Sequence, residues 1–325
     1  MKPAVTLALL ATTALLGGCV SVHNSAPETR ISTAQAAATA DARADRAMAE
    51  DPLAAAAPDT MRWLYGSGEA AGVSIQAYRM LADYAVAVSR RHSVPQSVPM
   101  GLPDAPGGIG ATSCVNPDNS LKPLAAVFDV DETVLLNRGY EFWQAYSGHG
   151  YESGEWADYA NHGAPSVAPV PGALAAFKRL RAAGITVIFN TNRKADTAAG
   201  AAAAIAAAGL GPAVHGETLF LAGDDAMGSR KDGRRATIAA KFCVIALGGD
   251  NLGDFADVFN TSGLAPQARR ALAERADIAQ LWGAGWFALP NPVYGDSIKG
   301  SVGEVFPPAA RWQPGAARAV NDKDK

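Results

Sequence analysis

The sequence is short of cysteine and of excess charge of either sign. Three cysteines in 325 residues are too few for a fold held together by disulfides. The 28 basic and 31 acidic side chains leave a formal net charge of −3, so we expect no nucleic-acid polymer as a partner and no polybasic membrane-binding patch. The length allows one large domain or two smaller ones, and either has room for a substantial core.

The apolar run near the N-terminus, Ala4 to Leu16, is too short to span a bilayer. It follows Lys2 and precedes small residues, an order typical of an export signal, so we predict that residues 1–18 are a signal peptide. The Leu-Gly-Gly-Cys sequence that ends at Cys19 resembles the lipobox of bacterial lipoproteins. That resemblance implies that Cys19 is acylated and, because Val20 rather than Asp follows it, that the lipid anchors the exported protein to the outer membrane. A plain cleaved signal peptide is the alternative.

The next stretch, residues 19–60, is rich in Ala, Asp and Arg and carries no apolar stripe, so we predict a flexible spacer. Apolar residues then recur at three- and four-residue steps, which predicts an amphipathic helix from about Gly68 to Arg91. We assign residues 61–123 to an N-terminal helical segment. At the other end of the chain, residues 313–325 are predicted to be a disordered tail.

Four short apolar runs alternate with helical patterns in the remainder of the chain. They are Leu124–Phe128, Ile185–Phe189, Leu219–Leu221 and Phe242–Leu247. Strands that alternate with helices are typical of a doubly wound parallel sheet, so we predict an α/β fold for residues 124–312. The first run reads as a buried strand, and it stops at two aspartates, Asp129 and Asp131.

Aromatic side chains are concentrated in one stretch, which holds seven of them between Tyr140 and Tyr159. Glycines interrupt this stretch, which is too irregular for a strand of the main sheet and too aromatic for a plain loop. We therefore interpret residues from about 137 to 168 as an insertion that forms a helical, aromatic-rich cap over the sheet edge.

Polar groups of different chemical kinds stand at or near the predicted strand ends: the pair Asp129 and Asp131, the hydroxyl of Thr191, the ammonium group of Lys231, and the pair Asp250 and Asp254. The carboxyl ends of parallel strands meet at one edge of a sheet. A nucleophile, metal-binding carboxylates and cationic or hydroxyl donors are what phosphoryl transfer requires. Taken alone, the first aspartate pair is equally compatible with a turn that caps a helix from Glu132 onward.

These residues resemble the motifs of the haloacid dehalogenase (HAD) superfamily and, within it, of the class C bacterial lipoprotein acid phosphatases, a group that includes 5′-nucleotidases. Besides the lipobox, the resemblance covers about residues 61–295. It rests on Asp129-Val130-Asp131-Glu132-Thr133-Val134-Leu135, Thr191-Asn192-Arg193, Lys231 with Arg234-Arg235, Gly249 to Phe255, Pro290 to Gly295, and the pattern from Trp63 to Tyr78. The chain departs from the family pattern at Asn190, where an apolar residue is usual, and at Asp296-Ser297-Ile298.

The resemblance implies a hydrolysis in two steps. Asp129 attacks phosphorus and forms an aspartyl-phosphate, while Asp131 protonates the leaving alkoxide and then activates water. Thr191 and Lys231 hold the phosphoryl oxygens.

The resemblance also implies a cofactor and further substrate contacts. Mg²⁺, which prefers hard oxygen ligands, is expected to bind the carboxylates of Asp129, Asp250 and Asp254 and the carbonyl of Asp131. Asn192 and Arg193 are expected to contact the substrate, a small-molecule phosphate ester.

Substrate choice is predicted from the cap. Tyr140 and Trp143 follow the Asp129 loop closely enough to overhang the leaving group, and aromatic planes can stack on a nucleobase. We therefore predict a preference for nucleoside 5′-monophosphates. The alternatives are a general phosphomonoesterase without nucleotide preference and a non-catalytic surface lipoprotein that retains the fold. The sequence contains no Arg-His-Gly-x-Arg signature, which excludes histidine-nucleophile phosphatase chemistry.

Two features stay open at the level of the sequence. Cys243 lies in an apolar run and is most simply a core residue, but a disulfide with Cys114 is the alternative in an exported protein. The oligomeric state is not determined.

Overall fold

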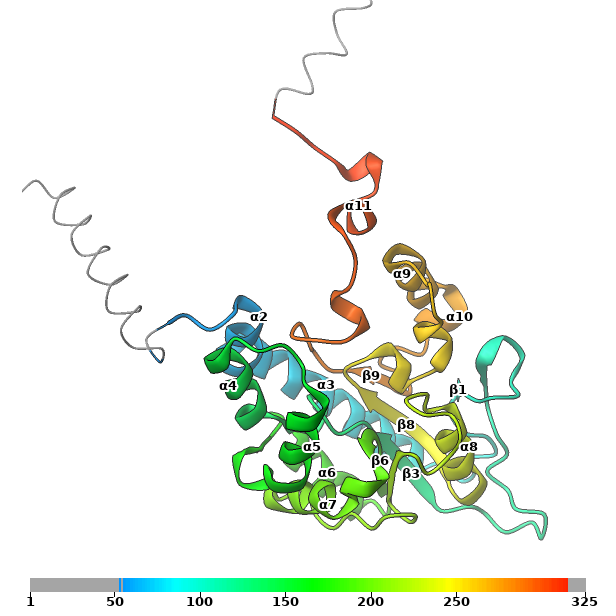
Figure 1. Ribbon diagram of the computed structural model, residues 1–325. Coiled ribbons are helices and arrows are strands. Elements are labelled where there is room, and N and C mark those ends of the chain that lie inside the picture. Colours follow the sequence, from blue (N-terminus) through cyan, green and yellow to red (C-terminus); the bar gives the residue numbers. More distant parts are fainter. Residues whose placement is uncertain (1–52, 54, 315–325) are drawn as a thin grey trace, which may run out of the picture. The chain divides into compact units, whose positions relative to one another are not determined.

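The computed structural model describes residues 53 and 55–314 of the chain (Figure 1). The predicted signal peptide, Cys19, most of the predicted spacer and most of the predicted tail lie outside these described residues. The chain divides between Ala55 and Ala56, and every element below belongs to the second part. Within the described residues, no helix combines the length and the hydropathy that a membrane span needs.

A five-stranded sheet forms the centre of this part, with the strand order β7-β6-β3-β8-β9. All four neighbouring pairs are parallel, which confirms the predicted doubly wound α/β fold. In that order the strands are Leu219–Ala222, Thr186–Lys194, Leu124–Phe128, Cys243–Gly249 and Trp286–Ala288.

The observed strands differ from the predicted ones in two ways. Strand β6 continues beyond its apolar run, because Lys194 still pairs with Ala222 of β7 after an irregularity in register. Strand β9 was not predicted, because its three residues are too few to show a pattern of their own. It exists because it pairs with the end of β8.

Helices flank the sheet. They are α3 (Gly68–Ser89), α6 (Ala173–Ala182), α7 (Ala198–Ala207), α8 (Asp232–Lys241), α9 (Pro266–Glu274) and the short α10 (Ala276–Ala279). The predicted helix from Gly68 is α3, whose start is capped by the Ser67 hydroxyl, which accepts a hydrogen bond from the backbone N–H of Ala70 at 3.1 Å.

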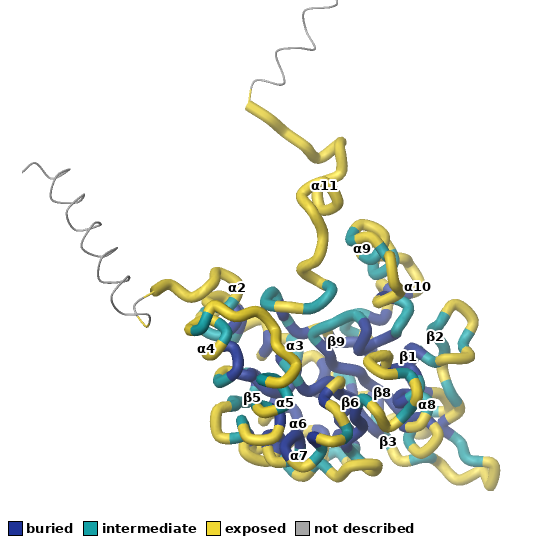
Figure 2. Tube along the Cα trace, in the orientation of Figure 1, coloured by how far each residue is buried: buried dark blue, intermediate teal, exposed yellow. Residues whose placement is uncertain are grey.

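Side chains of the central strand alternate between two hydrophobic cores, as a sheet covered on both faces requires. Ala126 and Phe128 of β3 belong to the core that α3, α6 and α7 close. Ala125 and Val127 belong to the core that α8 and α10 close. Figure 2 shows the buried strands enclosed by these helices.

The cap is the segment between β4 (Leu135–Leu136) and β5 (Ala168–Pro169), which pair antiparallel at its base. It contains α4 (Arg138–Ser147), α5 (Ser153–His162) and the 3-10 turn η4 (Ala164–Ser166). Three aromatic rings, those of Tyr140, Trp156 and Tyr159, pack against one another with centroids 4.9 to 5.7 Å apart. The cap therefore has a small aromatic core of its own.

Shorter elements connect these parts. They are α2 (Asp59–Met61), the π-helical turn η2 (Arg62–Gly66), β1 (Met100–Gly101), η3 (Pro106–Gly108), β2 (Ile109–Gly110), η5 (Ala195–Thr197), η6 (Leu252–Asp254), η7 (Asp257–Asn260), η8 (Asp296–Ile298), α11 (Val302–Val305) and η9 (Pro308–Ala310).

Cys114 and Cys243 form a disulfide. Cys114 lies in the connection before β3, Cys243 begins β8, and both side chains are buried. The bond joins residues 129 positions apart, so it removes much conformational freedom from the unfolded chain, an effect typically of about 2–4 kcal/mol. The sequence left open whether Cys243 is a core residue or a disulfide partner. In the structure it is both.

Candidate active site

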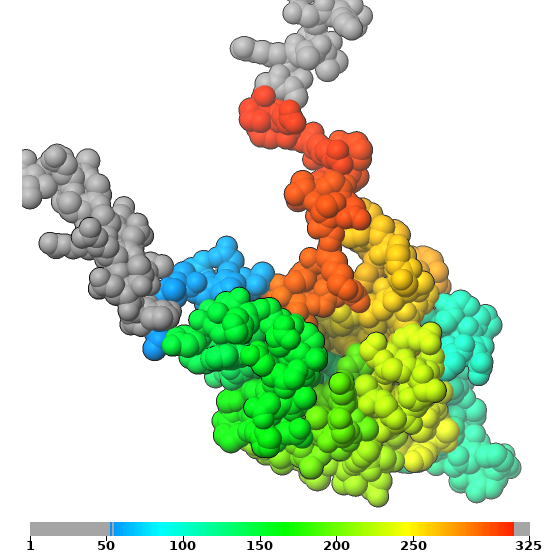
Figure 3. Space-filling view, in the orientation of Figure 1, coloured from blue at the N-terminus to red at the C-terminus, as the bar shows by residue number. Residues whose placement is uncertain are grey.

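The carboxyl ends of β3, β6 and β8 meet at one edge of the sheet and border a cavity of about 1060 Å³. Figure 3 shows the cap, in green, beside the yellow segments that follow β7 and β8. The cavity is lined by most of the residues that the sequence predicts for the site: Asp129, Asp131, Tyr140, Asn192, Arg193, Lys231, Asp250 and Asp254.

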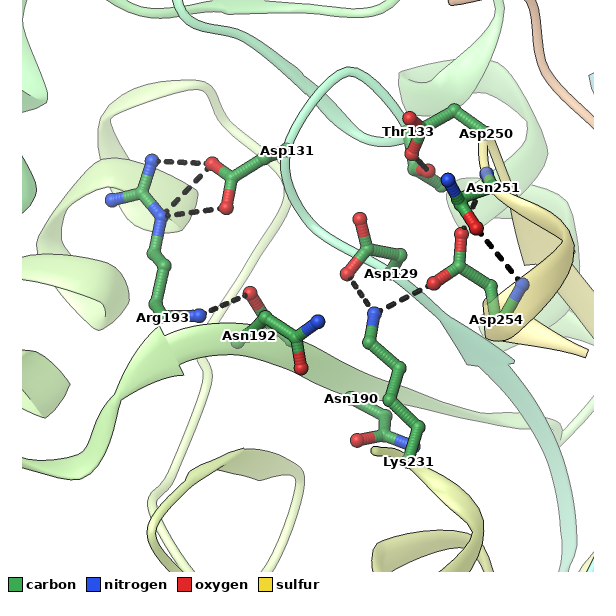
Figure 4. Close-up of polar contacts among 12 residues, drawn as sticks. Asp129, Asp131, Thr133, Asn190, Asn192, Arg193, Lys231, Asp250, Asn251 and Asp254 are labelled. Carbon is green, nitrogen blue, oxygen red and sulfur yellow. Dashed lines mark hydrogen bonds and ion pairs between the residues drawn. The ribbon is translucent and has the colours of Figure 1, made fainter. Parts of the chain in front are cut away.

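The predicted nucleophile, Asp129, is buried beside a lysine. The Lys231 ammonium group donates to Asp129 Oδ1 and, at 2.7 Å, to Asp254 Oδ1 (Figure 4). Burial raises the pKa of Asp129 above its ordinary value, the charge of Lys231 opposes this, and the neighbouring carboxylates add to it. Burial alone lowers the pKa of Lys231, but its contacts with Asp129 and Asp254 outweigh that effect and raise the pKa.

Asp250 is held in one orientation by two neutral donors. Its Oδ1 accepts a hydrogen bond from the Thr133 hydroxyl at 2.6 Å, and its Oδ2 accepts one from the Asn291 amide at 2.8 Å. Burial, followed by the nearby charge of Asp254, raises the pKa of Asp250 to about 7. A cation close to this carboxylate would stabilise its ionised form.

Among the described residues, carboxylate oxygens of Asp129, Asp250 and Asp254 lie within 4.8 Å of one another. The backbone N–H of Asn251 donates to the second oxygen of Asp254 at 2.8 Å. Three oriented, hard oxygen donors that repel one another suit a divalent cation. This chemistry fits the predicted metal site, and the cluster contains three of the four predicted ligands.

The fourth predicted ligand is the backbone carbonyl of Asp131, and the carboxylate of this residue turns away from the cluster (Figure 4). Its Oδ1 accepts hydrogen bonds from Arg193 Nη2 at 2.7 Å, from Arg193 Nε at 3.0 Å and from the Asn137 amide at 2.9 Å. The Arg193 guanidinium is buried, donates also to Asn137 Oδ1 at 2.9 Å, and lies 5.5 Å from the ring centre of Trp156 in the cap. Arg193, predicted to contact substrate, therefore directs its donors at Asp131 and Asn137.

The end of β6 presents a different side chain to the cavity from the one predicted to bind phosphoryl oxygens. Thr191 is fully buried, does not line the cavity, and its hydroxyl accepts a hydrogen bond from the backbone N–H of Arg193 at 3.1 Å. Because side chains alternate along a strand, the next residue, Asn192, is exposed to the cavity instead. The arrangement favours Asn192 over Thr191 as the polar contact here.

Glu132 is a site residue that the sequence reasoning assigned no role. It is buried, has a positive φ of 54°, and accepts hydrogen bonds from the Tyr65 hydroxyl at 3.0 Å, from the Asn137 backbone N–H at 2.9 Å and from the Tyr294 hydroxyl. Burial, followed by the charge of Asp131, raises the pKa of Glu132 to about 7. The sequence did contain a clue to the role of Glu132, since its partners Tyr65 and Tyr294 lie in two of the stretches that carry the family resemblance.

The two cap aromatics predicted to contact substrate differ in their position relative to the cavity. Tyr140 lines the cavity but is buried in the aromatic core of the cap. Trp143 is 40% exposed, is absent from the cavity lining and packs near Tyr146 and His149. The helical period explains this, because the cavity face of α4 carries residues 140, 141 and 144, and residue 143 falls on another face.

Comparison with known proteins agrees with this geometry. Residues 111–297 match the family described as HAD superfamily, subfamily IIIB (acid phosphatase). The fold is similar to the class C acid phosphatase from Bacillus anthracis with tungstate bound, with 22% identity, a TM-score of 0.57, and coverage of 73% of this chain and 84% of that one. A second structure of the Bacillus anthracis enzyme matches with the same identity and coverage and a TM-score of 0.54.

No curated protein matches this chain. The family match nevertheless covers more than half of the sequence and includes Asp129, Asp131, Lys231, Asp250 and Asp254. The structural similarity supports the same fold. The resemblance seen in the sequence is thereby confirmed: the chain belongs to the acid phosphatases of HAD subfamily IIIB and is a phosphoric monoester hydrolase.

Proposed function

We propose that this acid phosphatase is Mg²⁺-dependent and works through an aspartyl-phosphate on Asp129. The observation that carries the proposal is the contact of Lys231 with both Asp129 and Asp254 beneath the cavity. The Lys231 ammonium group stabilises the ionised form of Asp129, and it lies where it can bind phosphoryl oxygens.

Asp129, Asp250 and Asp254 are the residues that would hold the cation. When bound, Mg²⁺ neutralises charge on the phosphoryl oxygens. Thr133, Asn291 and the Asn251 backbone orient these carboxylates, and such outer contacts support metal affinity.

Asp131 is the proposed general acid and base. It lies two residues beyond the nucleophile, lines the same cavity and has no contact with Lys231 among the described interactions. Arg193 and Asn137 hold its carboxylate, so they act as positioning residues in this proposal. Proton transfer to the leaving alkoxide requires such a fixed group within reach of the ester oxygen.

We propose nucleoside 5′-monophosphates as the preferred substrates. Two aromatic rings on the cavity wall are accessible for stacking: Tyr151 is 65% exposed and Tyr294 is 38% exposed. The Tyr294 hydroxyl is bound to Glu132, which fixes the direction of its ring. These two replace Tyr140 and Trp143 as the candidates, because Tyr140 is buried in the cap and Trp143 does not line the cavity.

We also propose that the enzyme is exported and anchored to the outer membrane through acylated Cys19. The Cys114–Cys243 disulfide supports export, since such bonds persist in oxidising compartments. That pairing leaves Cys19 as the third cysteine of the sequence. If Cys19→Ser moved the protein from the membrane fraction to the soluble fraction, the anchor would be established; retention in the membrane would refute it.

One assay tests the catalytic proposal. The purified chain, without residues 1–18, should hydrolyse a panel of phosphate esters with Mg²⁺ and lose activity in EDTA. Faster turnover of nucleoside 5′-monophosphates than of glycerol phosphate supports the substrate proposal, and equal rates indicate a general phosphomonoesterase.

A further inference from the structure

Two adjacent arginines of α8 differ in their contacts with carboxylates. Arg234 and Arg235 are both 1% exposed. Arg235 forms ion pairs with Asp232 and Asp257, whereas Arg234 has no carboxylate within ion-pair distance among the described residues. A buried guanidinium without a counter-ion is costly, so a residue of this kind needs a reason to be there.

Arg234 directs its donors at the end of β6. Its Nε donates to Asn190 Oδ1 at 2.8 Å and its Nη2 donates to Asn192 Oδ1 at 2.7 Å, while Nη1 reaches the carbonyl of Gly228 at 3.1 Å. Asn190 is the residue that departs from the family pattern, where an apolar side chain is usual. In this chain the polar residue is buried because Arg234 satisfies it.

The contact with Asn192 determines which way its amide faces. A guanidinium has donors only, so the amide must turn its oxygen to Arg234 and its NH₂ group elsewhere. Asn192 lines the cavity together with Asp129 and Lys231. In Figure 4 the amide nitrogen of Asn192 is on the side turned toward these two residues.

We propose that Arg234 is a positioning residue that holds Asn192 with its NH₂ group directed at the phosphoryl oxygens of the substrate. Negative charge on those oxygens is what the site must stabilise during transfer, and a pre-oriented donor does so without reorganisation. The inference depends on the phosphatase activity of the family, and it is independent of the metal identity and of the nucleotide preference proposed above.

The test is a double-mutant cycle read by two measurements: kcat/KM on phenyl phosphate, and binding of inorganic phosphate by calorimetry. Asn192→Ala should lower kcat/KM about 100-fold, as loss of one transition-state donor does. Arg234→Gln should lower it about 10-fold in the wild-type background and by less than about 2-fold when Asn192 is already Ala, because coupled residues are not additive. Phosphate affinity should follow the same pattern.

Two results would overturn the inference. One is an equal loss from Arg234→Gln in both backgrounds, which means that Arg234 does not act through Asn192. The other is unchanged phosphate affinity in Asn192→Ala.

A second variant covers the case in which Arg234→Gln does not fold. Asn192→Asp keeps the oxygen that Arg234 binds but has no NH₂ group and adds negative charge. It should bind inorganic phosphate at least about 10-fold more weakly than Asn192→Ala. Both variants lack the NH₂ group, so the difference reports the added charge, and equal or tighter binding would overturn the inference by showing that the Asn192 side chain does not face the bound phosphate. Phosphate binding is measured without turnover, so a wild-type protein that binds phosphate but hydrolyses no ester would refute the proposed catalysis and not this inference.

Discussion

The floor of the active site and the cap are built in different ways. On the floor, Asp129, Asp254 and Lys231 are each less than 10% exposed, and every one has at least one charged partner. In the cap, aromatic side chains range from buried Tyr140 to Tyr151, which is 65% exposed, and their contacts are largely with one another. Chemistry demands a fixed geometry of charges, whereas substrate choice needs only a surface of suitable shape.

The comparison predicts the largest effect for the nucleophile. Asp129→Asn should lower kcat by at least about 10⁴-fold, because the covalent step has no other carboxylate in its place. The measurement is steady-state turnover of phenyl phosphate with Mg²⁺ present. The purified variant should have a native circular dichroism spectrum, and substantial activity in it would exclude the aspartyl-phosphate mechanism.

A smaller loss of activity is expected when one of the three carboxylates of the acidic cluster is removed. Asp250→Ala should lower activity by about 10²- to 10³-fold at low Mg²⁺, with part of the loss recovered at high Mg²⁺, since two carboxylates of the cluster remain. Thr133→Ala is the milder companion, because it removes one hydrogen bond to Asp250 and no ligand. A Mg²⁺ dependence identical to that of the wild type in Asp250→Ala would place the cation elsewhere.

Variants of the exposed tyrosines on the cavity wall should change substrate choice rather than chemistry. Tyr294→Ala or Tyr151→Ala should lower kcat/KM on AMP by roughly 5- to 150-fold, the equivalent of about 1–3 kcal/mol of base stacking, with little change on glycerol phosphate. Trp143→Ala is the matched control, because Trp143 belongs to the cap but does not line the cavity. An equal loss on both substrates would show that the tyrosines only support the structure of the cavity wall.

The last prediction concerns stability and pH, and it leaves the chemistry of the site unchanged. Glu141 is a buried cap residue whose pKa is raised from 4.5 to about 7 by burial and then by the charge of Asp131. The folded state thus keeps a proton that the unfolded chain releases, so the wild type should lose stability relative to Glu141→Gln as pH rises from about 4.5 to 7. Above pH 7 the difference should be constant, at about 3 kcal/mol.

The measurement is the free energy of unfolding in urea at pH 4.5, 6 and 8. Glu152→Gln, at an exposed glutamate of the cap, is the control and should show no such trend. If the difference between the wild type and Glu141→Gln did not depend on pH, Glu141 would not titrate as a buried group.

Much of this molecule follows from local sequence. The apolar run Leu124–Phe128 that stops at Asp129 predicts a buried strand with a carboxylate at its end, because burial and period are encoded in consecutive residues. The same reasoning predicts the convergence of Asp129, Lys231 and Asp250, since parallel strands place their carboxyl ends at one edge.

Other features depend on packing between distant parts of the chain. Tyr65 and Tyr294 donate hydrogen bonds to Glu132 across separations of 67 and 162 residues. The sequence pattern does not reveal which hydroxyl groups donate to this buried carboxylate. The orientation of the Asn192 amide depends on Arg234, 42 residues away. Which face of α4 borders the cavity, and hence that Trp143 does not, depends on how the cap packs over the sheet edge. The sequence by itself determined four of the five strands of the central sheet, the charged residues near their ends and hence the class of chemistry. Only the tertiary structure decided which donor serves which acceptor, because hydrogen-bond partners are selected by distance in space and not by position in the chain.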